Sequence, residues 1–178
     1  MVDYGLKDKV VIITGANNPQ GIGATTALSF ARNKAKIVIV YKKIAYNYDE
    51  SKTLKNGFDR YYKLNSENTQ TVETKLRELN AQYITLEKDI SDKIQVGEIF
   101  NSAIKQFGKI DILVNNAAVD DETGKDTIEN ITSEIIDSIF SVNVRGSMLM
   151  MKEFIKNNKN NGRIINLSTD SSQVFAGQ

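Results

Sequence analysis

The residues best suited to bind a ligand are three glycines of a turn near the N-terminus. Gly15, Gly21 and Gly23 follow a β-branched run at residues 10–13 and precede small and apolar residues. Such a turn suits a phosphate, because glycine lets the backbone approach a ligand and the first turn of a helix offers unpaired N–H groups at its positive end. The turn is therefore a candidate phosphate-binding site.

Each glycine has an expected role in a dinucleotide-binding turn. We expect Gly15 to make the turn, Gly21 to admit a pyrophosphate and Gly23 to let the helix pack on the strand. Five residues separate Gly15 from Gly21, where the usual fingerprint has fewer. A glycine-rich turn alone is equally compatible with a purely structural role.

Four other clusters come directly after runs that are typical of buried strands: Tyr41-Lys42-Lys43, Asp89-Ile90, Asn115-Asn116 and Ser168-Thr169. In a doubly wound sheet, ligands bind beyond the carboxyl ends of the strands. We therefore expect these clusters to meet the glycine turn at one edge of the sheet. This coincidence is the strongest argument from the residues alone for a cofactor.

The segments that must position these clusters alternate between strand and helix patterns. β-Branched and apolar runs predict strands at residues 10–13, 35–41, 83–86, 110–114 and 163–167. Apolar residues at helical spacing predict helices over residues 22–33, around residues 72–79, from a Ser91 cap to Gly108, and from Thr132 to about Lys156. This alternation predicts a Rossmann-like, doubly wound parallel sheet in an α/β domain, truncated after the fifth strand.

Two segments carry a further expectation. Residues 42–68 are polar and contain several tyrosines, and we expect a loop insertion there, which in a compact domain is usually functional or mobile. The helix from Thr132 has apolar positions on two sides, so it has more than one surface to bury. That helix lies either deep in the core or between the sheet and a partner subunit.

Length and composition limit the kind of protein. The 178 residues suffice for one domain with a substantial core, so we expect residues 1–178 to form a single dinucleotide-binding domain. A net charge of +1 gives no reason to expect a nucleic acid or a membrane surface as a partner. The chain has no cysteine and no histidine, which excludes disulfides and histidine general bases, and we expect no metal site. Without a signal peptide or a membrane-spanning run, a cytoplasmic protein is expected.

Taken in order, the motifs resemble those of the short-chain dehydrogenase/reductase family, especially reductases that act on 3-oxoacyl thioesters. The resemblance extends over nearly the whole chain and rests on Thr14-Gly15 with Gly21-Ile22-Gly23, on Asp89-Ile90, on Asn115-Asn116-Ala117-Ala118 with alanine in place of the final glycine, on Asn143-Val144-Arg145-Gly146, and on residues 162–169. It implies a cofactor site that comprises Gly15, Asn18, Gly21, Ile22, Gly23, Tyr41, Lys42, Asp89, Ile90, Asn116, Ala117 and Ala118. In that site Asp89-Ile90 would bind the adenine.

The resemblance also implies catalytic residues. Asn143 would hold a water in a proton relay. Ser168 or Thr169 would orient the carbonyl of the substrate, and Ser171 lies nearby in the sequence. Counting from Gly162 favours Thr169, whereas counting back from the expected tyrosine favours Ser168.

The family's proton-donating tyrosine, and a lysine four residues later, should follow that hydroxyl residue. The sequence ends at Gln178, before them. Tyr48 and Lys52 have the right spacing but lie after the second strand, so we reject them as the catalytic pair. We expect the sequence to be the N-terminal portion of a longer reductase fold, with a truncated product that lacks this activity as the alternative.

The residues after the second strand bear on the choice of cofactor. An acid there would accept hydrogen bonds from a ribose 2′-OH and favour NAD, whereas a cation accommodates a 2′-phosphate. The chain has Tyr41 where the acid would stand, followed by Lys42 and Lys43. We therefore expect NADP(H), with NAD(H) as the alternative. The other interpretation of this pair is that both lysines simply lie on a solvent-exposed loop and bind no ligand.

Together these features predict an oxidoreductase that transfers hydride between NADP(H) and a small-molecule carbonyl or hydroxyl substrate, assembled as a homo-oligomer (a dimer or a tetramer). An enoyl-thioester reductase is one alternative, because its glycine turn also has five intervening residues. The run Asn115-Asn116-Ala117 and Asn143 argue against it. A non-catalytic nucleotide-binding protein is the other alternative, because the sequence lacks the tyrosine and lysine pair.

Overall fold

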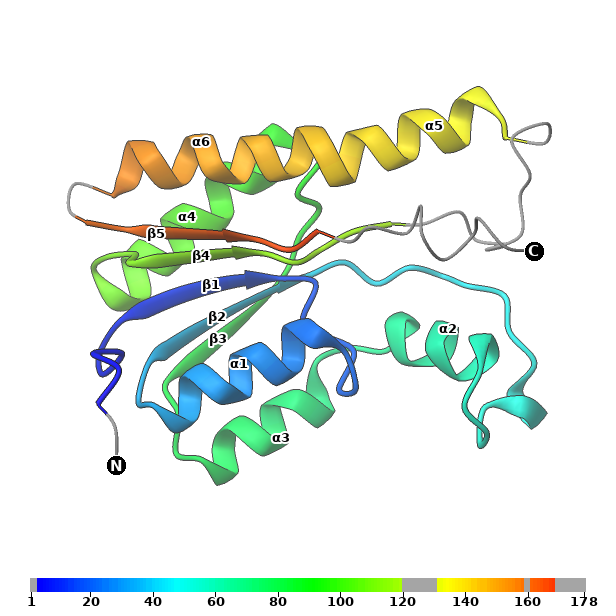
Figure 1. The fold of residues 1–178 in the computed structure, drawn as a ribbon, viewed down its shortest axis with the longest axis horizontal. Coiled ribbons are helices and arrows are strands. Elements are labelled where there is room, and N and C mark those ends of the chain that lie inside the picture. Colours follow the sequence, from blue (N-terminus) through cyan, green and yellow to red (C-terminus); the bar gives the residue numbers. More distant parts are fainter. Residues whose placement is uncertain (1–2, 120–130, 159–160, 169–178) are drawn as a thin grey trace.

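The structure, a computed structural model that describes residues 3–119, 131–158 and 161–168, is a five-stranded parallel sheet between two layers of helices (Figure 1). The strands are β1 (Val10–Thr14), β2 (Lys36–Tyr41), β3 (Tyr83–Glu87), β4 (Ile112–Asn115) and β5 (Arg163–Asn166). Their order in the sheet is β3-β2-β1-β4-β5, which is that of a doubly wound fold. This order confirms the predicted fold class.

Helices cover both faces of the sheet (Figure 1). One face carries α1 (Ile22–Arg32) and α3 (Gln70–Glu78), and the other carries α4 (Lys93–Phe107) and one long helix. The long helix runs through α5 (Ser133–Ile139), the π-helical segment η2 (Phe140–Gly146) and α6 (Ser147–Asn157). A short 3-10 turn, η1 (Glu50–Lys52), and the helix α2 (Phe58–Ser66) lie between β2 and α3.

Burial on both faces explains the unbroken apolar runs of the central strands. Along β1, Val11 and Ile13 belong to the core under α1 and α3, whereas Val10 and Ile12 belong to the core under α4 and α6. The alternation follows from the two-residue repeat of a strand. β5 pairs with β4 and is largely exposed, so it is the edge of the sheet within the described residues.

Two local predictions need correction. Residues 42–68 are not a loop throughout, because they contain η1 and α2. Ring contacts of Tyr62 with Tyr46 and Phe58 stabilise α2, and the polar composition of the segment conceals this packing. The cap of α4 is Asp92, which accepts a hydrogen bond from the N–H of Ile94 (2.7 Å), and not Ser91.

The long helix begins as predicted, because the Thr132 side chain accepts a hydrogen bond from the N–H of Ile135 (3.3 Å). It continues to Asn157, one residue beyond the expected end. The spacing of apolar residues does not indicate that the middle of this helix, Phe140–Gly146, is π-helical. A π-helical turn inside an α-helix frequently marks a functional site.

Neither a membrane span nor a metal cluster is found in the part of the chain that the structure describes. No helix there has both the length and the apolar character that crossing a bilayer requires. No three side chains of the Asp, Glu, His or Cys type come together there in a way that could hold a metal ion.

Candidate functional site

Four of the five predicted clusters, all except Ser168-Thr169, meet at a cleft of about 730 Å³ beyond the carboxyl ends of the central strands. The predicted cofactor residues among its lining are Gly15, Asn18, Gly21, Ile22, Tyr41, Lys42, Asp89, Ile90, Asn116, Ala117 and Ala118. Gly23 is buried behind the turn. The cleft lies where the strand order reverses between β1 and β4, which is where doubly wound sheets bind their ligands.

Gly15 and Gly23 have no room for a side chain. Gly15 has a φ of 69°, in the left-handed region, and a Cβ there would lie 2.7 Å from the Cα of Ala117. A Cβ on Gly23 would overlap the carbonyl oxygen of Gly15 and lie 2.6 Å from Nδ2 of Asn116. Gly15 therefore makes the turn, and Gly23 allows α1 to start close against it.

The N-terminus of α1 has the features of an anion site. Gly21 is its N-cap, no side chain caps the helix, and its first turn contains no acidic residue. Asn18 closes the preceding turn on itself, because its Oδ1 accepts a hydrogen bond from the N–H of Gln20 and its carbonyl accepts one from the N–H of Gly21 (2.9 Å each). The helix start thus offers backbone donors and a positive dipole end to the cleft. A pyrophosphate fits this arrangement.

A hydrogen-bond network locks the end of β4 to the glycine turn. The side-chain amide of Asn116 donates to the carbonyls of Thr14 (2.9 Å) and Gly15 (2.8 Å). In return, the buried Thr14 Oγ1 accepts hydrogen bonds from the N–H groups of Asn116 and Ala117 (3.0 Å each). The Asn116 side chain therefore positions the turn, and Asn116, Ala117 and Ala118 border the cleft.

The two lysines after β2 are already paired with acids at the end of β3. Lys42 Nζ lies 2.6 Å from Oδ2 of Asp89, and Lys43 Nζ lies 3.3 Å from Oε2 of Glu87. A 2′-phosphate at this position would have to compete with both carboxylates for the lysines. This pairing was not predicted, and it joins residues far apart in the sequence.

The Asp89 carboxylate is held ionised. Burial raises the pKa of this carboxyl, but the hydrogen bonds that it accepts from Lys42 and Ser91 outweigh burial, so its pKa lies below the ordinary value. Ile90 beside it is buried against the long helix, since a Cβ on Gly146 would come within 2.9 Å of the Ile90 side chain. The Asp89-Ile90 pair thus connects the cleft with the long helix.

Tyr41 occupies the position at which an acid would favour NAD. Its side chain is buried, and its hydroxyl donates to Oε2 of Glu87 over 3.4 Å. Burial and the neighbouring Glu87 carboxylate raise the pKa of the phenol, so the phenol is neutral at physiological pH. Tyr41 therefore contributes no charge to the cleft, and the charged groups at this point are the two lysines and their acid partners.

Of the predicted catalytic residues, Asn143 is the one whose contacts are best defined. It lies on η2, and its side chain pairs with the backbone of Val119: Oδ1 accepts from the N–H (2.8 Å) and Nδ2 donates to the carbonyl (2.9 Å). The pair ties the long helix to the chain that leaves β4. Both functional groups of this side chain are therefore engaged with the backbone, and a proton relay through Asn143 stays a prediction.

Of the three candidate hydroxyl residues, Ser168 is the one that the structure describes, and it is not brought into the cleft. Ser168 follows β5, is exposed and does not line the cleft. Thr169 and Ser171 lie outside the described residues. Their catalytic roles stay predictions.

The cleft has a further wall that the sequence interpretation missed. Asn17 of the glycine turn lines it together with Tyr46, Tyr61 and Asn65 from the 42–68 segment. The two extra residues of the turn could have indicated this wall, because a longer turn can reach a neighbouring element. The segment, first interpreted as a loop, is therefore part of the site.

Comparisons with known proteins show which family this chain resembles. A family model described as enoyl-(acyl carrier protein) reductase matches residues 60–178, more than half of the chain. A short-chain dehydrogenase/reductase of Pestalotiopsis microspora is 29% identical over 175 residues, which are 98% of this chain and 56% of that protein. The chain thus spans just over half the length of this curated relative.

Two solved structures resemble the fold. A short chain dehydrogenase from Burkholderia cenocepacia in complex with NADP matches with a TM-score of 0.74 and 24% identity, covering 96% of this chain and 59% of that one. An NADH-dependent reductase complexed with NAD matches with a TM-score of 0.72 and 21% identity, covering 99% and 66%. At these identities the likeness shows the fold.

Proposed function

Because the chain belongs to the short-chain dehydrogenase/reductase family, we propose that it binds NADP(H) in the cleft and transfers hydride between this cofactor and a small-molecule carbonyl or hydroxyl substrate. The observation that carries the proposal is the uncapped start of α1 at Gly21, which opens on a cleft at the switch point of the sheet. The complexes of the solved family members with NADP and NAD support a nicotinamide dinucleotide.

Each part of the site would have its own role in this reaction. The N–H groups at the start of α1 would hold the pyrophosphate, and Asp89 with Ile90 would border the adenine. Bound nicotinamide supplies or accepts the hydride. Ser168 or Thr169 would hold the carbonyl oxygen of the substrate, and Asn143 would keep the long helix in register with the end of β4 while it supports the proton relay. We also propose that residues 1–178 act as one dinucleotide-binding domain within this activity.

A titration with both nucleotides tests the preference for NADP(H). Replacement of Lys42 by alanine (Lys42→Ala) removes a cation from the cleft wall and leaves the Asp89 carboxylate without its partner. We expect the affinity for NADPH to fall about tenfold, roughly 1.4 kcal/mol, and the affinity for NADH to change by less than about twofold. Calorimetry on the two proteins measures both dissociation constants.

The matched control is Lys93→Ala, which makes the same change in net charge at the exposed start of α4, at a residue that does not line the cleft. It should leave both affinities unchanged. An equal loss for both nucleotides in Lys42→Ala, or no loss for either, would show that Lys42 does not contact a 2′-phosphate.

Reduction of an enoyl thioester is the second candidate activity. The description of the matching family model favours it, and so do the five residues between Gly15 and Gly21. The Asn116 network and Asn143 favour a carbonyl substrate instead. Oxidation of NADPH with 3-oxoacyl thioesters and simple ketones, but not with enoyl thioesters, would support the first proposal, and the reverse pattern would support the second. Tight binding of NADPH with no turnover of any substrate would indicate a non-catalytic nucleotide-binding protein.

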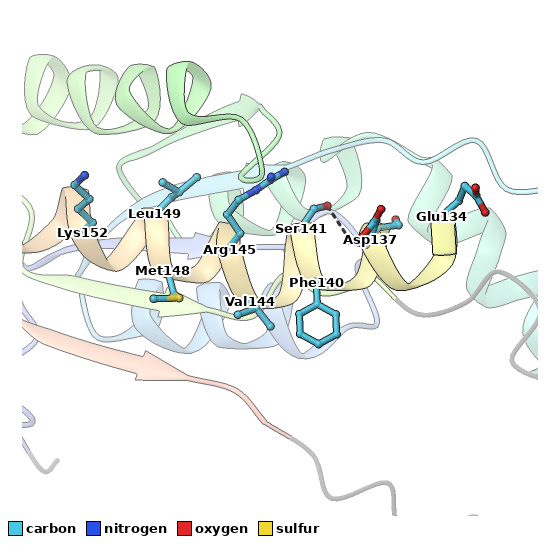
Figure 2. A pocket seen from close by; sticks show the side chains of 10 residues that line it. Glu134, Asp137, Phe140, Ser141, Val144, Arg145, Met148, Leu149 and Lys152 are labelled. Carbon is cyan, nitrogen blue, oxygen red and sulfur yellow. Dashed lines mark hydrogen bonds between the residues drawn. The ribbon is translucent and has the colours of Figure 1, made fainter. Parts of the chain in front are cut away.

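We further propose that the chain self-associates through the outer face of the long helix. Its exposed apolar side chains Ile136, Phe140, Val144 and Met148 follow one another at intervals of four residues. Figure 2 shows Phe140, Val144 and Met148 of this face. They line a hollow of about 1070 Å³, with Glu134 and Asp137 toward one end of it and Lys152 toward the other. A monomer rarely exposes such a continuous apolar stripe.

The order of charges along this face suits a second copy in antiparallel orientation. A two-fold axis near Val144 would place Phe140 against Met148 of the second copy, since both lie four residues from Val144. The same axis would place Asp137 near Lys152 of the second copy. A surface that is complementary to itself in this way favours a dimer over association with an unrelated partner.

The double substitution Val144→Lys and Met148→Lys tests this interface. On the axis, the lysine at position 144 would meet its symmetric copy, and the lysine at position 148 would be buried against Phe140 of the second copy, so we expect the dimer to dissociate at least about a hundredfold more readily. Sedimentation equilibrium measures the association constant. Ile94→Lys, which puts a charge on an exposed apolar position of α4, is the control and should leave association unchanged. A native protein that sediments as a monomer at high concentration would contradict the proposal.

A further inference from the structure

The glycine turn is fastened to the neighbouring helix α2 by a buried asparagine. Asn17 stands in the part of the turn that exceeds the usual length, yet only 6% of its surface is exposed. Both hydrogens of its side-chain amide are used: Nδ2 donates to the carbonyl of Asn65 (2.9 Å) and to the carbonyl of Glu67 (3.1 Å). These contacts join residues about fifty positions apart in the sequence.

The two carbonyls belong to the C-terminal end of α2. The last carbonyl groups of a helix have no partner within the helix, so another group has to satisfy them. Asn17 does so here, and it therefore acts as a C-terminal cap that comes from a distant part of the chain. The turn also meets α2 nearer its start, since Arg60 Nε donates to Oε1 of Gln20 over 3.3 Å.

α2 is in turn held to the cleft. Its Tyr62 ring stacks on the ring of Tyr46, with centroids 4.7 Å apart, and Oγ of Ser66 accepts a hydrogen bond from the N–H of Tyr46 (3.4 Å). Tyr46, Asn65 and the glycine turn all line the cleft. In Figure 1, α2 lies beyond the end of the sheet, away from the helices that cover its faces. The contacts with Asn17 and Tyr46 are thus what place it against the site.

We propose that Asn17 is a positioning residue for the bound nucleotide: it holds the lengthened glycine turn against α2 so that the backbone N–H groups of the turn are preorganised for the pyrophosphate. A longer turn has more conformations to lose when it binds a ligand. A turn that is already ordered in the free protein avoids that loss on binding. The attachment of the turn to α2 by Asn17 does not depend on any activity, whereas its effect on nucleotide binding rests on the proposed function.

The fastening is tested in the free protein by hydrogen exchange. Asn17→Ala removes both donors, and we expect the backbone amides of residues 61–66 to exchange about tenfold faster. Asn17→Asp keeps the size of the side chain but places a carboxylate oxygen, in the position of Nδ2, against two carbonyl oxygens, so it should accelerate exchange at least as much. Asn47→Ala, at an exposed asparagine of the same segment, is the control and should change nothing. Unchanged exchange in both Asn17 variants would overturn the proposal.

The effect on the nucleotide is tested by calorimetric titration with NADPH and with NADH. In Asn17→Ala we expect both affinities to fall about tenfold and by equal factors, because the pyrophosphate is common to both nucleotides. A merely structural role would accelerate exchange in α2 and leave both affinities unchanged, and that result would overturn the positioning role.

A third measurement needs no variant. Saturating NADPH should slow exchange at residues 61–66 of the unaltered protein, because a ligand that orders the turn also orders the helix fastened to it. Binding of NADPH with no change in that exchange would overturn the proposal. If the unaltered protein bound neither nucleotide, the proposed function would fail, while the exchange rates of the free variants would still decide whether Asn17 fastens α2.

Discussion

Gly23→Ala is expected to destabilise the protein by about 3 kcal/mol, because the added methyl group overlaps atoms that cannot move aside independently. Its Cβ would overlap the carbonyl oxygen of Gly15, lie 2.6 Å from Nδ2 of Asn116 and lie 3.0 Å from the Cα of Ala16. Two of these neighbours are backbone atoms of the turn. Asn116 cannot swing away without giving up its hydrogen bonds to the turn.

The clash can be relieved only if α1 moves away from the turn. That movement would displace the N–H groups at Gly21 from the cleft, so nucleotide affinity should fall together with stability. Denaturant unfolding, followed by circular dichroism, measures the free energy of unfolding. Gly97→Ala is the matched control. Gly97 lies inside α4, and an added Cβ would have no atom within 4 Å apart from its chain neighbours and the backbone of its own helix, so alanine there should stabilise the protein by about 0.5–1 kcal/mol. A Gly23→Ala protein as stable as the native one would show that the turn is not packed as described.

Thr14→Val should cost about 2–4 kcal/mol although the two side chains have nearly the same shape. Thr14 is fully buried at the end of β1, and its Oγ1 accepts hydrogen bonds from two consecutive N–H groups, those of Asn116 and Ala117. Valine would leave both donors without this acceptor. The backbone between β4 and the cleft would then have to move toward water.

Thr14→Ser separates the hydroxyl from the methyl group. Serine keeps the acceptor and leaves a small cavity, so we expect a loss of only about 1 kcal/mol. Thermal unfolding of the three proteins measures this. We expect the unfolding temperature to be highest for the native protein, lower for the serine variant and lowest for the valine variant. An order in which the valine variant unfolds above the serine variant would mean that packing of the methyl group, rather than the hydrogen bonds, is what Thr14 contributes.

The local pattern of the chain was sufficient to predict the sheet. Runs such as residues 10–13 and 36–41 are β-branched because both faces of these strands are covered, and the same burial makes them recognisable in the sequence. The position of the cleft followed from the same pattern, since polar clusters after parallel strands must meet at one edge. The predicted lining residues, from Gly15 to Asp89 and Asn116, do border one cleft.

The features that were missed depend on contacts between distant residues. The pairing of Lys42 with Asp89 and the capping of α2 by Asn17 join parts of the chain that are about fifty residues apart. No spacing rule within a segment indicates them. Ser91 and Asp92 illustrate the same limit at short range: either suits a helix cap, and the choice follows from the engagement of Ser91 with Asp89.

The central claim is that a pyrophosphate binds to the backbone N–H groups at the start of α1. A crystal structure of the protein soaked with saturating NADPH tests it most directly. We expect density for the pyrophosphate within hydrogen-bonding distance of the N–H groups that follow Gly21, with the adenine beside Asp89 and Ile90. Nucleotide density at another edge of the sheet, or none in the cleft of a protein that a titration shows to bind NADPH, would contradict the account.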